Sequence, residues 1–467
     1  MALATPPQFV ESAQKISKSR RIYVPKKGWI MRGLVVLGLM MIIVYNLYVG
    51  LYLTDPLVAY STIMPLHALL VVIVGWFFYR NPAVGKDRNE LVSVLIPVFN
   101  QESMIDTVID AIFNSTHRNL EVIAVNDGST DNSKQILDRL SKKYPLLKVI
   151  HRKNQGKRHA VATGFVKSSG RYVVLIDSDS VVDKNAISEF MKTFDADPDV
   201  GSVVGYAKVW NSNKNILTKC QDAWYDYAFN IHKTTESRLG NVLCCSGCLA
   251  GYRREAIADF IPYWIKAKIQ NSDDRDLTTY VIAQDWVKKE LAPFSKKLLD
   301  SGADYDDAED RMLTAQTLTE WKSLYVSSAF VYTDVPEKLR GYIRQQTRWK
   351  KGFIRSNFFV STFFWKKNPI ISSIFYTEFM VTFTAPLIVL IILFYEPFIL
   401  KNYWVPFAFI SGSFLAGFAH GLDYKMRDPT SKNWKYKPLM NFFTSFCLSW
   451  LVIPALLTFR KNQWLTR

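Results

Sequence analysis

Two acidic residues spaced two apart follow an apolar stretch near the middle of the chain. The segment reads Arg171-Tyr-Val-Val-Leu-Ile and continues as Asp177-Ser178-Asp179. Carboxylate oxygens are good ligands for Mg²⁺ or Mn²⁺, and such a cation in turn neutralises a diphosphate. A solvated turn is the alternative for two such residues taken alone, but the preceding strand-like stretch favours chemistry. We therefore predict a divalent metal at Asp179 and Asp177, with Asp177 also close to the substrate.

A second polar turn, Asn126-Asp127-Gly128, also follows an apolar stretch. Asp127 could accept hydrogen bonds from a nucleotide base or ribose, while Gly128 lets the backbone turn sharply. Farther along, Lys157 and Arg158 stand directly after a glycine. These cations predict a contact with nucleotide or phosphate, with an ordinary basic loop as the alternative.

The elements that must position these residues lie in the middle of the chain. Residues 91–335 alternate between strand-like stretches such as LVSVLIPVF and helix-like stretches such as DNSKQILDRLSKKY. This alternation predicts an α/β, Rossmann-like domain with a mainly parallel sheet. Ligands bind such sheets at the carboxyl ends of the strands, which is where the polar turns fall.

Both ends of the chain carry long apolar runs. Two N-terminal runs, at about 34–53 and 57–79, are each long enough to cross a bilayer core of about 30 Å as a helix. An amphipathic, aromatic segment after Trp349 predicts a helix lying in the membrane interface. Three further apolar runs follow at about 372–399, 403–420 and 438–459, and Pro454 predicts a bend in the last. We therefore predict a basic N-terminal segment at 1–28, two membrane-spanning helices at 29–80 and the α/β domain at 81–349. The interface helix follows at 350–371, the C-terminal membrane-spanning helices at 372–459 and a short tail at 460–467.

The charge balance supports a membrane location. The formal net charge is +17, and basic residues gather beside the apolar runs, as at Arg20-Arg21 and Lys26-Lys27. Positive residues are retained on the cytoplasmic side, so we expect the catalytic domain to be cytoplasmic and the protein to be integral to the plasma membrane. No segment resembles a nucleic-acid-reading module, and we expect no nucleic-acid partner. Five cysteines without a paired framework fit a reducing compartment.

Several motifs together resemble one known family. These are VSVLIPVFNQ, VNDGSTDNS, NQGKRHA and LIDSDS, followed by Gln345-Gln-Thr-Arg-Trp349. The combination is similar to processive membrane glycosyltransferases of family 2, and within them most similar to hyaluronan synthases. The resemblance implies a GT-A-like domain flanked by transmembrane α-helices. It also implies UDP-GlcNAc and UDP-GlcA as donors, Mg²⁺ or Mn²⁺ as cofactor, a polysaccharide product and a lipid bilayer around the protein.

The resemblance also implies roles for single residues. Asp127 and Lys157 would hold the uridine, and Asp179 with Asp177 would engage the metal and the diphosphate. Gln345, Arg348 and Trp349 would flank the acceptor and the pyrophosphate, with Trp349 stacking on the terminal sugar. A tail motif would approach the donor site through Trp464, Thr466 and Arg467.

The general base has two candidates, because the family's short acidic motif occurs twice. One copy contains Asp274 and the other contains Asp310, which precedes SLYVSSAFVYTDVP as the family pattern requires. We therefore expect Asp310 to be the base, with Asp274 as the alternative. The stretch 256–305 is longer than the family pattern.

Other functions fit fewer of these residues. A chitin or poly-N-acetylglucosamine synthase would use the same motifs with a different second donor. A dolichyl-phosphate sugar transferase would share the early motifs but would not need Gln345, Arg348 and Trp349. A lipid-binding or channel-like protein would explain only the apolar runs.

Overall fold

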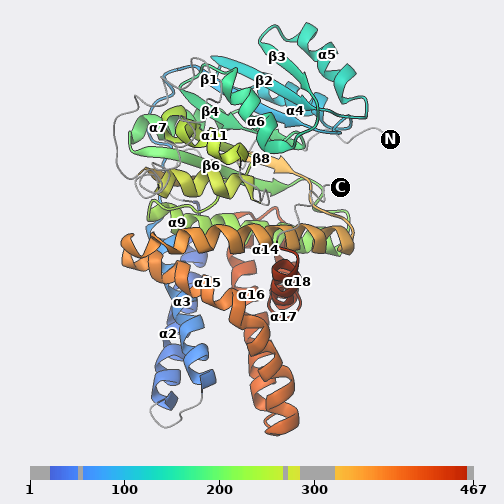
Figure 1. Cartoon of the computed structure of the whole chain (residues 1–467). Coiled ribbons are helices and arrows are strands. Elements are labelled where there is room, and N and C mark those ends of the chain that lie inside the picture. Colours follow the sequence, from blue (N-terminus) through green and yellow to red (C-terminus); the bar gives the residue numbers. More distant parts are fainter. Residues whose placement is uncertain (1–21, 51–55, 267–271, 284–320, 460–467) are drawn as a thin grey trace.

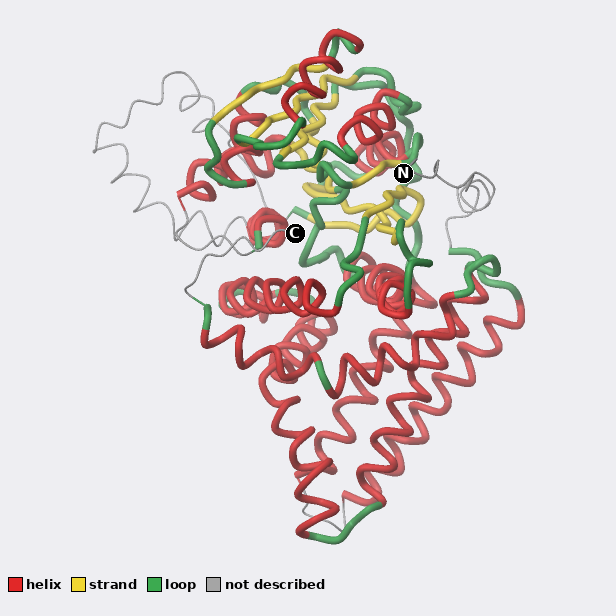
Figure 2. Tube along the Cα trace, turned by 90° about the vertical axis from the view of Figure 1, so that its right-hand side faces the viewer, coloured by secondary structure: helices red, strands yellow, loops and turns green. Residues whose placement is uncertain are grey.

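The computed structural model describes residues 22–50, 56–266, 272–283 and 321–459. Figure 1 shows a sheet domain at the top, a long helix lying across beneath it, and helices descending below. Figure 2 gives the same division after a quarter turn, with strands confined to the upper part.

An eight-stranded sheet forms the upper domain, in the order β3-β2-β1-β4-β7-β6-β8-β5. The strands β1 to β4 are parallel to one another, and β6 is parallel to β8. The antiparallel strands are β7, between β4 and β6, and β5, beside β8. The prediction of a mainly parallel α/β sheet is thus confirmed, since four of the seven strand pairings are parallel, and the three antiparallel pairings all involve strands of the second half of the sheet. The bounds are β1 Val92–Val98, β2 Leu120–Asp127, β3 Leu147–Arg152, β4 Tyr172–Leu175, β5 Ser180–Val182, β6 Val200–Val209, β7 Ala250–Arg253 and β8 Lys322–Thr333.

The helices of this domain cover the sheet with apolar faces. In α4 the buried residues recur every three or four positions, as the burial of one helix face requires. β2, in contrast, is buried at every position, as expected of a strand covered on both faces. The bounds are α4 Ile105–Phe113, α5 Ser133–Lys143, α6 Lys157–Val166, α7 Ala186–Ala196, α8 Ile216–Tyr227, α9 Thr234–Arg238, α10 Arg254–Ile257 and α11 Ile261–Lys266, with further helical residues at 273–283.

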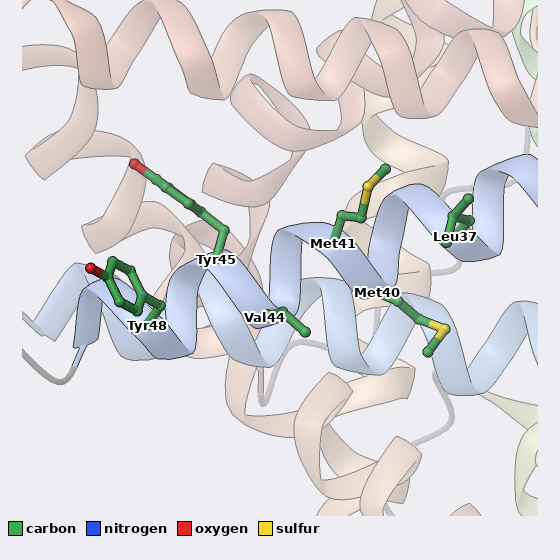
Figure 3. Close-up of a pocket in the computed structure, with 6 residues that line it drawn as sticks. All are labelled: Leu37, Met40, Met41, Val44, Tyr45 and Tyr48. Carbon is green, nitrogen blue, oxygen red and sulfur yellow. The ribbon is translucent and has the colours of Figure 1, made fainter.

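Four helices of the described chain are long and apolar enough to cross a membrane: Lys26–Gly50, Ala59–Phe78, Pro369–Ile399 and Trp404–Arg427. They comprise α2 (Lys26–Gly50), α3 (Pro56–Ile73), α15 (Pro369–Leu390) and α16 (Trp404–Arg427), two of them with wider-turn extensions. Figure 3 shows a hollow on α2 lined by Leu37, Met40, Met41, Val44, Tyr45 and Tyr48. These residues are largely exposed apolar side chains of the kind that faces lipid.

The last apolar run is bent by 45° between Asn433–Phe446 and Leu448–Leu457. A bend was expected at Pro454, but the break is at Cys447, between α17 (Lys437–Phe446) and the helical turns that lead into α18 (Val452–Leu457). Pro454 is instead in the first turn of α18, where a helix has no need of the missing N–H.

The helix that lies across the molecule is α14, from Leu339 to Ser361. It runs beneath the sheet domain and above the apolar helices (Figure 1). Gln345, Arg348 and Trp349 lie within its first half, so the acceptor motif and the amphipathic segment after it form one continuous helix.

Candidate active site

The polar turns meet at one edge of the sheet. Strand β1 pairs with β2 on one side and with β4 on the other, all parallel. Asp127 ends β2, and Asp177 follows the end of β4. Because parallel strands end at the same edge, the register brings these turns together.

Asp127 organises the loop that leads into α6. Its buried carboxylate accepts hydrogen bonds from the backbone N–H groups of Gln155, at 3.2 Å, and Gly156, at 2.7 Å. Arg152 Nε lies 3.2 Å from the same carboxylate. Gly156 has a φ of +96°, which favours glycine, and α6 begins at the next residue, Lys157. Asp127 therefore fixes the position of the loop end from which α6 begins, and with it the position of Lys157.

A cluster of one cation and two carboxylates lies at the centre of the site. Lys157 Nζ is 2.5 Å from Asp177 Oδ1 and 3.6 Å from Asp274 Oδ1. The backbone of Gly247 joins the two acids, since its N–H donates to Asp274 Oδ2 at 2.8 Å and its carbonyl accepts from Asp177 N at 2.9 Å. The cluster therefore contains residues from four elements: α6, the end of β4, the loop before β7 and helix 273–283.

Position 247 is crowded by the ends of these charged side chains. A Cβ atom there would lie 2.8 Å from both Asp274 Oδ1 and Lys157 Nζ, and 3.2 Å from Asp177 Oδ1. Any side chain would push these charged groups apart. Gly247 was not among the predicted site residues, although it ends the segment GNVLCCSG shortly before the buried strand β7.

The charged groups in the cluster shift one another's pKa values. Burial raises the pKa of Asp177 above its ordinary value, and the nearby Lys157 opposes that rise. Burial lowers the pKa of Lys157, but the carboxylates of Asp177 and Asp274 outweigh it, so that the net shift is upward. Lys157 therefore remains a cation beside the position where a diphosphate would bind.

Asp177 and Asp179 are the two residues predicted to hold the metal. Ser180 Oγ donates a hydrogen bond to Asp179 Oδ1 at 3.2 Å. In the described part of the chain, no group of three or more His, Cys, Asp or Glu side chains could hold a metal ion. Two carboxylates suffice for Mg²⁺, which commonly keeps one or two carboxylate ligands together with waters and substrate phosphates. The residues present fit a metal that binds together with its substrate.

Arg158 does not take the role predicted for it. Its side chain is fully buried, pairs with Asp273 and lies 2.6 Å from Asp276 Oδ2 through Nη2. It also donates to the carbonyl of Trp264 at 3.0 Å. A guanidinium enclosed in this way faces the protein and not a ligand. Arg158 instead ties α6 to the helix that carries Asp274.

Helix 273–283 is also tied to α14. Asp276 lies 3.5 Å from Arg355 Nη1, and Ser356 Oγ donates to the same carboxylate at 3.2 Å. Arg275 Nη2 donates to Asn357 at 2.5 Å. The segment bearing Asp274 is therefore held between the donor-side helix α6 and the acceptor-side helix α14.

The residues predicted to flank the acceptor lie on α14, which contacts the sheet domain through α8. The indole ring of Trp349 stacks against Trp224 of α8, with centroids 5.9 Å apart and an interplanar angle of 23°. Gln345 Oε1 is buried and has no hydrogen-bond partner among the described residues. Burial raises the pKa of Tyr225, and the charge of Arg348 opposes that rise. Trp224 and Tyr225 were not among the predicted site residues, although the aromatic run Trp-Tyr-Asp-Tyr at 224–227 was a signal.

Four predicted site residues lie outside the described residues: Asp310, Trp464, Thr466 and Arg467. Their predicted roles stay predictions. The described residues do include Asp274, the second candidate for the base, in direct contact with the central cluster.

Known proteins resemble this chain in sequence and in fold. Residues 93–260 match the family described as "Glycosyl transferase family 2". A hyaluronan synthase of Streptococcus pyogenes is 30% identical over 447 residues, which cover 93% of this chain and 97% of that protein. An N-acetylglucosaminyltransferase of Rhizobium meliloti (strain 1021) is 30% identical over 287 residues, covering 59% of this chain and 60% of that protein.

The fold is found in solved glycosyltransferases as well. A mannosyltransferase of Pyrobaculum calidifontis, solved with GDP-Man and Mn²⁺, superimposes with a TM-score of 0.50 at 16% identity. The match covers 94% of this chain and 100% of that one. The chain therefore belongs to glycosyl transferase family 2 and is a glycosyltransferase of the hyaluronan synthase family.

Proposed function

We propose that this protein polymerises UDP-GlcNAc and UDP-GlcA into hyaluronan at the cytoplasmic face of the plasma membrane. The observation that carries the proposal is the match to a hyaluronan synthase over almost the whole of both chains. The match extends through the acceptor motif and the apolar helices, beyond the sheet domain that most family-2 enzymes share. The helices long enough to cross a bilayer support a membrane enzyme.

We propose Asp274, in place of Asp310, as the general base. Its carboxylate is fixed by the N–H of Gly247 and lies beside Lys157, at the edge of the sheet where the donor would bind. In the reaction Asp274 takes the proton of the acceptor hydroxyl as that oxygen attacks the anomeric carbon of the donor. The bond from that carbon to the diphosphate breaks, UDP departs and the configuration inverts.

Asp127 and Lys157 serve the donor in this proposal. Asp127 shapes the loop through two backbone N–H groups, and Lys157 stands at the start of α6 beside Asp177. A cation there stabilises the negative charge that the departing UDP acquires.

The divalent ion would be Mg²⁺ or Mn²⁺, held by Asp179 and Asp177. When bound, it would neutralise the diphosphate and improve it as a leaving group. Gln345, Arg348 and Trp349 would contact the acceptor side, and the tail residues Trp464, Thr466 and Arg467 the donor side.

The alternative is a synthase that uses UDP-GlcNAc alone. It is supported by the N-acetylglucosaminyltransferase of Rhizobium meliloti and by a poly-beta-1,6-N-acetyl-D-glucosamine synthase of Staphylococcus aureus (strain COL), which is 26% identical over 273 residues. These matches cover 59% and 58% of this chain, against 93% for the hyaluronan synthase, and we therefore favour the latter.

The deciding experiment incubates the purified full chain with each UDP-sugar singly and with the two together. Hyaluronan synthesis predicts polymer only with both donors, and complete digestion of that polymer by a hyaluronan-specific lyase. Polymer from UDP-GlcNAc alone that is cleaved by a chitinase or a hexosaminidase would establish the alternative instead.

We further propose that the polymer leaves through the apolar helices. A hydrated polysaccharide cannot enter hydrocarbon unaided, because each unpaired hydroxyl costs roughly 2–7 kcal/mol there. The test reconstitutes the protein in sealed vesicles with the sheet domain outward and donors outside. Polymer that resists added glycosidase until detergent is supplied supports export, whereas polymer digested at once contradicts it.

A further inference from the structure

The aromatic surface at the acceptor side is larger than Trp349 alone. Trp224 and Trp349 are nearly parallel, and their ring centroids are 5.9 Å apart. Rings in direct face-to-face contact would be about 3.5–4 Å apart. The two indoles are therefore offset, and each leaves part of its faces uncovered by the other. Both side chains are only partly buried.

Tyr225 joins this surface to the reacting groups. Its ring meets Trp224 edge-on, with centroids 5.6 Å apart and an interplanar angle of 73°. Burial raises the pKa of Tyr225; among the charges around it, Asp179 also raises this pKa and Arg348 lowers it. Trp224 thus lies against Trp349 of α14, and the next residue of α8, Tyr225, packs edge-on against Trp224.

Hydrogen bonds to the apolar helices hold α8, the helix that carries Trp224 and Tyr225, in place. Asp222 accepts hydrogen bonds from Tyr424 Oη at 3.1 Å and from Asn433 Nδ2 at 2.9 Å. One turn later, Asp226 Oδ1 accepts from Arg427 Nη1 at 2.8 Å. These contacts come from α16 and from the turn before α17, so they fix α8 to the apolar helices on both sides of Trp224 in sequence.

We propose that Trp224 is a second sugar-binding platform, which holds the unit of the growing chain behind the one stacked on Trp349. Offset aromatic faces at successive steps suit consecutive pyranose rings, whose C–H faces pack on aromatic rings while their hydroxyls stay hydrated. The ligand class is the non-reducing end of a β-linked polysaccharide, because in the proposed reaction a hydroxyl of the growing chain attacks the anomeric carbon of the donor. This role rests on the proposed polymerase function, because an enzyme that transferred a single sugar would need no second platform.

The consequence is retention of the nascent chain between additions. A platform that contributes ~1 kcal/mol to holding the chain slows its release on the order of fivefold. Removal of the ring should therefore shorten the product without weakening the binding of UDP, which the proposed function assigns to Asp127, Lys157 and the metal.

The test compares Trp224→Leu and Trp224→Phe with the wild-type full chain. Product length is measured by gel electrophoresis, UDP affinity by calorimetry, and chain release after dilution of the donors. Trp224→Leu should shorten the product and speed release on the order of fivefold at unchanged UDP affinity, and Trp224→Phe should fall in between. Wild-type length and release in Trp224→Leu would overturn the proposal. If Trp224→Leu fails to bind UDP, Trp224→Phe decides, and wild-type values there would overturn it.

A matched control disturbs another stacked pair. Tyr144 stacks on Phe113 with centroids 4.2 Å apart, between α4 and α5 and away from the acceptor helix. Tyr144→Leu removes a stacked ring and should leave product length unchanged. A failure of the proposed function is distinguishable, because the wild type would then yield no polymer at all.

Discussion

Replacing Arg158 separates the two roles considered for this residue. Its guanidinium is fully buried between Asp273 and Asp276, which flank Asp274. Arg158→Gln removes the cation and leaves both carboxylates in place, with Asp177 and Asp274 close by. Breaking a buried ion pair in this way costs about 3–5 kcal/mol, because the remaining charges are poorly solvated.

Part of that cost should be relieved by local movement of helix 273–283. The helix keeps other contacts, including the hydrogen bond from Cys245 N to Thr278 Oγ1 at 2.8 Å and the ion pair of Asp276 with Arg355. We therefore expect Asp274 to shift while the sheet stays folded. A misplacement of about 1 Å costs on the order of 100-fold in rate.

The assay measures turnover from the release of UDP, and UDP affinity by calorimetry. If Arg158 positions Asp274, Arg158→Gln lowers kcat on the order of 100-fold while the Kd for UDP changes little, and Arg158→Lys recovers part of the rate. The control is Arg253→Gln, since Arg253 is also buried but donates to the carbonyls of Val200 and Phe194, and it pairs with Tyr172 at the start of β4, whereas Asp177 follows the end of β4. If Arg158→Gln instead raises the Kd for UDP at nearly normal kcat, Arg158 does not position Asp274. That result would favour the phosphate contact predicted from the sequence.

Further predictions concern the site and the fold. Asp274→Asn should bind UDP but make no polymer, whereas Asp310→Asn should remain active; the reverse result in UDP-binding and synthesis assays would return the base to Asp310. Gly247→Ala should keep its melting temperature but lose on the order of 100-fold in kcat, because the new methyl group displaces charged side-chain ends; near-normal turnover would contradict this. Asp179→Ala, or excess chelator with the wild type, should abolish transfer, and full turnover in chelator would remove the metal. The folded-state pKa of Glu121 is held down to about 2: burial opposes this, but hydrogen bonds from Ser93 and backbone N–H groups prevail. The stability that its charge contributes is thus present above about pH 4.5 and lost as the pH falls toward 2, so Glu121→Gln should lower the denaturation midpoint at pH 7 and have little effect near pH 2.

Much of the donor side could be predicted from local sequence. Asp127 and Asp177 each directly follow or end an apolar strand, and in a parallel sheet that position alone brings them to one edge. Lys157 was predictable for a similar reason, because the glycine before it starts a helix at that edge. The apolar helices were recognisable from length and composition, since hydrocarbon imposes both.

The base could not be chosen in the same way. The two acidic motifs are nearly alike in sequence, and the order of motifs along the chain favoured Asp310. The contact of Asp274 with Gly247 and Lys157 joins residues far apart in the chain, and no periodicity encodes such a contact.

The sequence by itself determined which residue types end the strands, which runs are apolar enough to cross a bilayer, and hence the class of chemistry. These properties depend on neighbours in the chain and on solvent. Only the tertiary structure decided that Arg158 faces inward to Asp273 and Asp276, and that Trp224 lies against Trp349. A long side chain can turn toward ligand or protein, and the choice depends on whether a distant segment supplies buried charges or rings for it to pack against.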